Sequence, residues 1–127
     1  MEGNDETNVE SIHPLISVHN FEDNILGNQI YFHVIKLSES FHICVGTAAV
    51  MKNMAVAMQT KYNKGSASGN ALFGDAGDTV SLNMAQKLAQ KTGKQVFVSC
   101  SVPYDQNLIP LVEKRISDEI KSHPQHF

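Results

Sequence analysis

The stretch KTGKQVFVS, residues 91–99, joins the end of one predicted element to the start of the next. The residues before it repeat apolar side chains at helical spacing, which predicts a helix over 79–92; the repeated side chains are Leu82, Ala85, Leu88 and Ala89. Asp78 or Thr79 can cap this helix at its start, and Gly93 suits the left-handed conformation that ends helices. The β-branched and aromatic residues after Gly93 predict a strand over 95–102.

Upstream of this helix, runs rich in Val, Ile, Phe and Tyr are separated by turn residues, which is typical of strands. The run 29–37 gives the strongest strand pattern, and a short turn at 38–40 returns the chain as the strand 41–47. The segment 53–60 fits a strand, although its Met and Ala residues are also compatible with a helix. Further strands are predicted over 15–21 and 70–73, with turn residues at 23–28 and a loop over 62–69.

A second helix is predicted near the C-terminal end of the sequence. Asp105 to Asn107 can cap it, and Pro110 is tolerated because it lies in the first turn. Its apolar stripe consists of Ile109, Val112, Ile116 and Ile120. Pro124 ends the helix.

About six strands and two helices predict an α+β fold: a mainly antiparallel sheet with both helices packed on one face. The chain has 127 residues, which suits one domain with a sizeable core, predicted to span 15–127. Residues 1–14 carry four acidic residues and no Lys or Arg, and they predict a flexible acidic tail.

Composition excludes several classes of function. The net charge of −3, the isoelectric point near 6.0 and the absence of Trp argue against nucleic-acid binding. A membrane helix needs about 20 consecutive apolar residues, and the sequence contains no such run. The acidic start of the chain lacks the pattern of a secretory signal, so we expect a cytosolic or nuclear protein with Cys44 and Cys100 as free thiols.

The predicted strands do not alternate cleanly between apolar and polar residues. Phe32, Val34 and their equivalents on the neighbouring strands are assigned to the helix-covered core; the equivalents are Phe41, Ile43, Val45, Val96 and Val98. The other side of these strands carries Tyr31, His33, Ile35, His42, Cys44 and Phe97. Two helices cannot cover both faces, so this semi-apolar patch predicts a partner-binding surface. A merely amphipathic, solvated face is the alternative.

Positive charge is concentrated in residues 52–94, which hold six lysines against two acidic residues: Lys52, Lys61, Lys64, Lys87, Lys91 and Lys94. Lys52, Lys61 and Lys64 could form a charged rim that meets an acidic partner surface. A solvated lysine-rich surface explains the same pattern.

No pattern typical of catalysis or of a metal site is found. Residues 69–75 have the glycine spacing of a phosphate loop but lack its Gly-Lys-Ser/Thr ending, so we expect a turn-rich loop. His33, His42 and Cys44 could lie near one another, but a zinc site would need further ligands. A cysteine nucleophile would need an activating base. We therefore expect no enzyme, no metal and no cofactor.

The runs NMAVAM, residues 53–58, and AQKLAQKTGKQVFVS, residues 85–99, resemble the family of proteasome assembly chaperone 4. Further segments follow in the same order, so that the resemblance covers about residues 16–127: 18–21, 31–34, 45–46, 72–75 and 111–116. It implies a fold shared with proteasome assembly chaperone 3, and a heterodimer of the two chaperones formed through their sheet faces. His42 and Cys44 stand where the family pattern has bulky aromatic residues.

The resemblance also implies a non-catalytic role, in which the heterodimer engages alpha-type subunits and promotes formation of the alpha ring of the 20S proteasome core. Templating is the implied mechanism, because a rigid surface can favour one order of subunits over others. A homodimeric small-ligand-binding or regulatory domain that uses the same sheet face is the competing interpretation, and a thiol-dependent enzyme is a third. The sequence leaves open whether the isolated chain self-associates.

Overall fold

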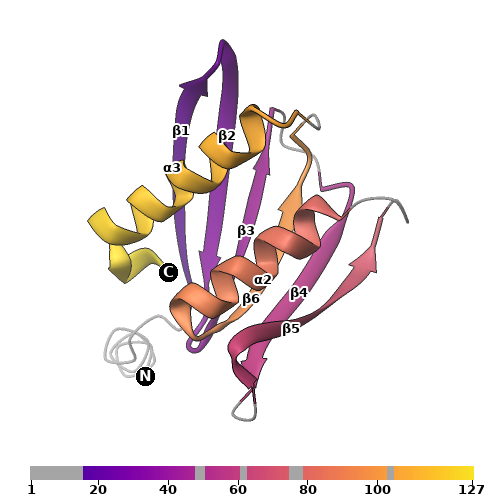
Figure 1. The fold of residues 1–127 in the computed structure, drawn as a ribbon. Helices are drawn as coiled ribbons and strands as arrows, with labels where there is room; N and C mark the ends of the chain where they lie inside the picture. The colour runs from indigo at the N-terminus through magenta and orange to yellow at the C-terminus, as the bar shows by residue number, and fades with distance from the viewer. Residues whose placement is uncertain (1–15, 48–50, 61–62, 75–78, 103–104) are drawn as a thin grey trace, which may run out of the picture.

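The computed structural model describes residues 16–47, 51–60, 63–74, 79–102 and 105–127. It has two layers, a six-stranded sheet and a pair of helices that lie across one face of that sheet (Figure 1). The strands are β1 (Ser17–Ile25), β2 (Asn28–Lys36), β3 (Ser40–Gly46), β4 (Met54–Thr60), β5 (Asn63–Phe73) and β6 (Gln95–Cys100). The helices are α2 (Val80–Thr92), α3 (Leu108–Ser122) and the short 3₁₀ helix η1 (Pro124–His126). Within the described residues, none of the helices has the length and apolar character that crossing a membrane requires.

The strands are ordered β1-β2-β3-β6-β4-β5 across the sheet. All neighbouring pairs are antiparallel except β3 and β6, which run parallel. The parallel pair arises because the chain leaves β3, forms the β4–β5 hairpin and α2, and then returns beside β3 as β6. The predicted α+β fold, with a mainly antiparallel sheet and both helices on one face, is confirmed. The boundary predicted at residue 14 lies outside the described residues and stays a prediction.

Helix α2 ends where the sequence predicts. Gly93 adopts a left-handed conformation with φ of 71°, and its N–H donates to the carbonyl of Ala89 at 2.8 Å. The start differs from the prediction, because Thr79 occupies the capping position without a side-chain hydrogen bond. The alternative cap, Asp78, lies outside the described residues. Packing of Leu88 against the sheet stabilises this helix.

Helix α3 begins after Asp105, whose backbone carbonyl accepts hydrogen bonds from the N–H groups of Leu108 and Ile109. The Asp105 carboxylate also accepts from the backbone N–H of Asn107 at 2.8 Å. Asn107 itself makes no side-chain cap bond, so the start of the helix is held by Asp105. The helix then turns Val112 and Ile116 fully into the core.

Several predicted boundaries are wrong. Strand β1 continues to Ile25 and turns at Leu26–Gly27, where both residues have positive φ, 52° and 81°. Residues 63–69 of the predicted loop 62–69 are part of β5, and the predicted last strand ends at Cys100 instead of Val102. The strand predicted over 53–60 is confirmed by β4, which spans Met54–Thr60, and its helical alternative is wrong.

The 63–69 part of β5 escapes sequence prediction because most of its residues are small. Gly69 shows what these small residues do: a Cβ atom placed on it would lie 2.8 Å from Cδ1 of Leu82 in α2. Close approach of the helix thus favours Gly at this position, although Gly is a weak strand former. Tertiary packing overrides the local preference.

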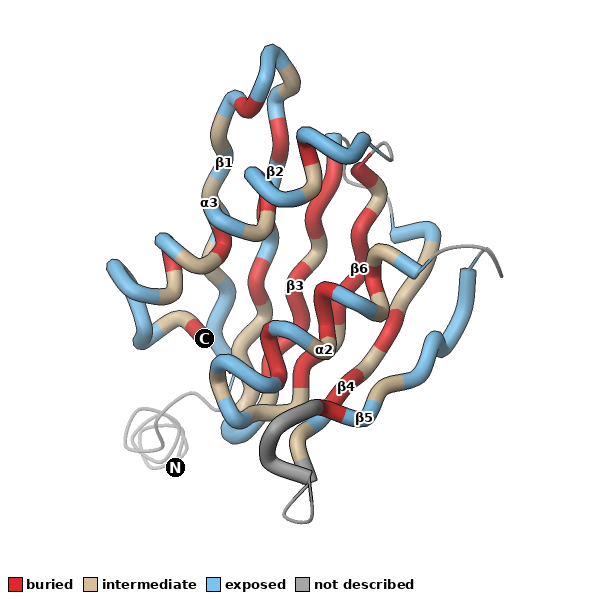
Figure 2. The backbone as a smooth tube through the Cα atoms, viewed as in Figure 1, coloured by how far each residue is buried: buried red, intermediate tan, exposed pale blue. Residues whose placement is uncertain are grey.

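The core lies between the sheet and the helices, where Figure 2 shows the buried positions of the central strands. The seven residues assigned to the core from the sequence are each at most 1% exposed: Phe32, Val34, Phe41, Ile43, Val45, Val96 and Val98. Burial of each such side chain contributes roughly 1.5–3 kcal/mol. The core assignment is therefore correct.

Candidate functional site: the outer sheet face

The outer face, meaning the side of the sheet opposite α2 and α3, carries all six residues predicted to bind a partner. Strand register brings them together: His33 lies opposite Cys44, and His42 lies opposite Ile35 on one side and Phe97 on the other. Tyr31 completes the group opposite Gly46, at one end of the β2–β3 pairing. Because directly paired residues share a face, the six form one patch across β2, β3 and β6. Their role in partner binding stays a prediction.

The six residues differ in exposure. Tyr31 is 46% exposed and His33 is exposed, whereas Ile35, Cys44 and Phe97 are half-buried. His42 is only 8% exposed, because it lies on the central strand β3 with apolar neighbours on both sides. Most of its ring is thus shielded from water by this chain's own residues.

Two polar pairs are set into this largely apolar face. The Nε2 atom of His42 lies 3.1 Å from the hydroxyl oxygen of Ser99, which is itself buried. On the neighbouring strands, Nδ1 of His33 is hydrogen-bonded to Oδ1 of Asn20. Burial, assisted by the nearby His33, lowers the pKa of His42, so this imidazole is neutral at pH 7. The outer face therefore carries neutral hydrogen-bonding groups at its centre.

The two cysteines differ in exposure, since Cys100 is buried and Cys44 is half-buried. Burial raises the pKa of the Cys44 thiol, which keeps it protonated at neutral pH. Cys44 and Cys100 are thiols that are not joined in a disulfide, as predicted. Across the described residues, no group of three or more His, Cys, Asp or Glu side chains is arranged to hold a metal ion.

A hollow of about 800 Å³ lies over the β1–β3 half of the outer face. Apolar and neutral polar residues dominate its lining, which includes Asn20, Tyr31, His33, His42, Cys44 and Met51. Among the described residues that line it, Glu22 is the only Asp, Glu, Lys or Arg. The hollow thus fits uncharged groups much better than ionic ones.

The β4 half of the outer face was missed by sequence reasoning. Ala55 and Ala57 point into the core and are each 1% exposed, whereas the larger residues Met54, Val56 and Met58 point the other way. Val56 lies opposite Phe97 of β6, so an apolar surface continues from the predicted patch. The alternation of small and large apolar residues was the available signal, because a solvated face would carry polar side chains at the large positions.

A β-bulge adds an aromatic residue to this half. The register of β4 and β5 shifts between Met54 and Ala55, so Phe73 instead of Leu72 comes opposite Met54. Paired residues share a face, which places Phe73 on the outer face, where it is 49% exposed. No pattern in the sequence predicts this bulge. The term apolar strip is used below for Met54, Val56, Met58 and Phe73.

The predicted lysine rim is only partly described. Lys52 is exposed, whereas Lys61 and the side chain of Lys64 lie outside the described residues. Two other lysines of the same region interact with α3 and the C-terminal segment: Lys87 pairs with Glu113 at 3.2 Å, and Lys94 donates to the backbone oxygen of Phe127. The rim stays a prediction.

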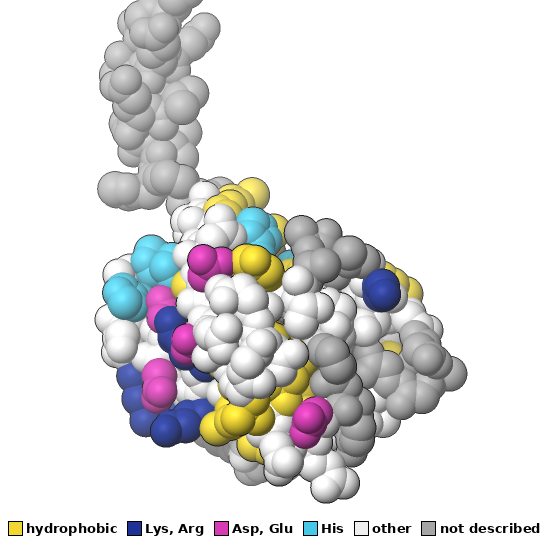
Figure 3. Space-filling model, turned by 90° about the horizontal axis from the view of Figure 1, so that it is seen from above, with side chains coloured by type: hydrophobic (Ala, Val, Ile, Leu, Met, Phe, Trp, Pro, Cys, Tyr) yellow, Lys and Arg dark blue, Asp and Glu magenta, His cyan; other side chains and the backbone are white. Residues whose placement is uncertain are grey.

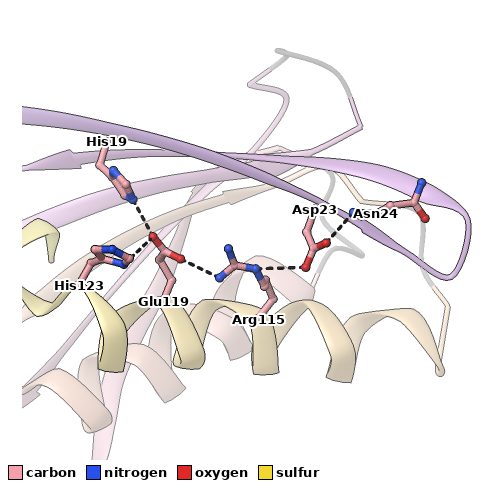
Figure 4. A network of polar contacts seen from close by, with 6 residues as sticks. All are labelled: His19, Asp23, Asn24, Arg115, Glu119 and His123. Carbon is pink, nitrogen blue, oxygen red and sulfur yellow. Dashed lines mark hydrogen bonds and ion pairs between the residues drawn. The ribbon is translucent and has the colours of Figure 1, made fainter.

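A second polar cluster lies on the helix side, away from the predicted patch (Figure 4). The Glu119 carboxylate accepts from His19 at 2.8 Å and from Arg115 at 2.8 Å, and it lies 3.2 Å from His123. Arg115 also pairs with Asp23 of β1 at 3.1 Å. Figure 3 shows charged and histidine side chains gathered on the side of the molecule where α3 lies. These contacts fasten α3 to β1.

The architecture defines a class, an α+β domain whose sheet keeps one apolar face outside its own core. Comparison with known proteins makes the class specific. The family model for proteasome assembly chaperone 4 matches residues 29–102. The proteins named proteasome assembly chaperone 4 in Mus musculus and Homo sapiens are each 41% identical over 113 residues, covering 88% of this chain and 91% of the relative. The chain belongs to the proteasome assembly chaperone 4 family.

A solved structure supports the fold independently of sequence. One chain from "Crystal Structure of a Novel Chaperone Complex for Yeast 20S Proteasome Assembly" superimposes with a TM-score of 0.66. The match covers 86% of this chain and 98% of the yeast chain at 12% identity. At a sequence identity this low, the match supports a shared fold and nothing further.

Proposed function

We propose that this chain is a non-catalytic chaperone subunit that pairs with proteasome assembly chaperone 3 and promotes assembly of the alpha ring of the 20S proteasome core. The observation that carries the proposal is the outer face: an apolar, nearly uncharged surface on a domain whose core is already complete on the other side. Surfaces of this kind mark protein-protein contacts. Family membership supports the role in proteasome assembly.

In this proposal the rigid heterodimer then engages alpha-type subunits in the cytoplasm or nucleus. Lys52 and its lysine neighbours in the sequence supply a positively charged rim for an acidic surface on such a subunit. Charges at a rim act mainly on the rate of association and are screened by salt. Alpha-ring templating would follow from which subunits the heterodimer accepts.

The decisive experiment places an acid on the outer face. Ile35→Asp and His42→Glu should abolish pairing with chaperone 3, because each would bury a charge in an apolar contact. Leu111→Asp is the matched control, since Leu111 is 40% exposed on α3 in the opposite layer. Size-exclusion chromatography of the mixed chaperones gives the readout, and circular dichroism checks the fold. Normal pairing by both outer-face variants would refute the assignment of this face.

The hollow favours a second candidate function, a homodimeric small-ligand-binding or regulatory domain. Its volume of about 800 Å³ lies within the range of ligand pockets, which is about 300–1,000 Å³. A metabolite library screened by thermal shift distinguishes the two functions. Stabilisation by a small molecule, together with failure to pair with chaperone 3, would favour the ligand-binding domain.

A further inference from the structure

The outer face divides into two halves of different chemistry. The β1–β3 half holds the hollow with its polar pairs, His42–Ser99 and His33–Asn20. The β4–β5 half holds the apolar strip, which Phe97 of β6 joins to the hollow. Both halves lie on one continuous sheet, so one partner surface can cover them together.

The two imidazoles have hydrogen-bonding capacity left over. Each ring has two nitrogen atoms, and the hydrogen bonds of the described residues use Nε2 of His42 and Nδ1 of His33. Within the described residues, every buried side-chain nitrogen or oxygen atom has a hydrogen-bond partner. The Nδ1 atom of His42 has no such partner there, so it must be accessible to solvent. A partner that covers the hollow therefore removes water from two polar atoms.

Covering these atoms has opposite consequences for different partners. A partner with a hydrogen-bonding side chain in the hollow replaces the lost water, whereas a wholly apolar partner leaves the imidazoles unsatisfied. The apolar strip makes no such distinction, because any apolar sheet can bury it. The hollow thus discriminates between partners, whereas the apolar strip adds affinity without adding selectivity.

We propose that His33 and His42 are the specificity-determining residues of the outer face, and that the occupant is an uncharged sheet of another chain that presents a hydrogen-bonding side chain to the hollow while covering the apolar strip. This inference rests on the proposed function, since it specifies what the same face selects. Because Glu22 is the only Asp, Glu, Lys or Arg among the described lining residues, the hollow offers little to compensate a buried charge of the partner, which argues for an uncharged partner group there.

The test compares affinity with selectivity. The double variant H33L/H42L keeps the face apolar but removes its polar atoms, and Val56→Ser with Met58→Ser weakens the strip. Binding to chaperone 3 is measured by isothermal titration calorimetry, and binding to a second copy of the chain by sedimentation equilibrium. We expect H33L/H42L to lower the ratio of heterodimer to homodimer affinity by about tenfold or more, chiefly through stronger self-association.

The strip variants should weaken both associations by similar factors and leave the ratio unchanged. An unchanged ratio in H33L/H42L would overturn the inference, as would a strip variant that shifts the ratio as strongly. His33→Leu alone, at an exposed position, preserves the test if the double variant does not fold. The variant His42→Glu distinguishes failure of this inference from failure of the proposed function. If His42→Glu loses pairing while H33L/H42L leaves the affinity ratio unchanged, only the inference is refuted. Normal pairing by both His42→Glu and Ile35→Asp refutes the proposed function as well.

Discussion

Glu119 of α3 accepts a hydrogen bond of 2.8 Å from His19 of β1, a residue 100 positions earlier in the chain. The Glu119 side chain is 7% exposed and also bonds Arg115, whose guanidinium lies 4.8 Å from the ring centre of Phe21. One carboxylate thus joins the last long helix to the first strand. These contacts of Glu119 stabilise the fold only while the carboxylate is ionised and its hydrogen-bond donors are in place.

Replacing Glu119 by Gln should destabilise the fold by about 1–3 kcal/mol, because the charged acceptor of several hydrogen bonds is lost in a buried position. Glu113→Gln is the matched control: its partner Lys87 is 67% exposed, and surface pairs contribute roughly 0–1 kcal/mol. Urea unfolding of both variants measures the difference. Equal midpoints would contradict a structural role for the Glu119 cluster.

Acidification should reduce the free energy of unfolding in two separate pH ranges. Burial and the charges of His19, His123 and Lys36 lower the pKa of His126 against the opposing effect of Glu119, and burial and His33 lower that of His42. The unfolded state therefore binds protons first, and stability present above the ordinary value of 6.5 is lost as the pH falls below it.

The lower range belongs to Glu119. Burial raises its pKa, but hydrogen bonds from His19 and Arg115 and the charges of Arg115 and His123 outweigh burial, so the net pKa is lowered. Its contribution is complete above 4.5 and is lost as the pH falls through the lower value of the folded state. Denaturation curves from pH 8 to 3 test both ranges. His42→Gln should reduce the loss of stability in the upper range, where His126 also contributes, and leave the lower range unchanged. Glu119→Gln should remove the loss in the lower range; a lower range that persists in Glu119→Gln would contradict the assignment.

Leu88→Ala and Ile116→Ala should each cost roughly 2–5 kcal/mol, because they remove side chains that are 5% and 0% exposed from the layer between helices and sheet. Leu111→Ala, at a 40% exposed position of α3, should cost much less. Urea midpoints of the isolated protein supply the comparison. A loss below about 0.5 kcal/mol for either core variant would place its helix wrongly.

Gly69→Val should destabilise the protein by about 1–3 kcal/mol through overpacking. A Cβ atom there would lie 2.8 Å from Cδ1 of Leu82, 3.1 Å from Cγ of Gln86 and 3.1 Å from the backbone oxygen of Val56. Ser68→Val is the matched control, since Ser68 is exposed next to Gly69 on the same strand. Thermal unfolding by circular dichroism compares the two. A stabilised Gly69→Val protein would show that α2 can move away from β5.

Much of this fold could be predicted from local sequence patterns. Alternating apolar residues identified β2, β3 and β6 and the correct core face, because each buried face demands apolar side chains at every second residue. The end of α2 at Gly93 could also be predicted from a local preference, because few residues other than Gly adopt a positive φ at low energetic cost. The family resemblance, carried by the order of short segments, also came from the sequence, and comparison with relatives confirmed it.

The tertiary structure alone decided what depends on register and on distant neighbours. The burial of His42 follows from its place on β3 between Ile35 and Phe97, and the outward position of Phe73 follows from a bulge. The Glu119–His19 contact joins residues that only packing brings together. Periodicity reports which face of its own strand or helix a residue occupies. It contains no information on which strand lies alongside, how the register shifts or which side chain arrives from 100 residues away.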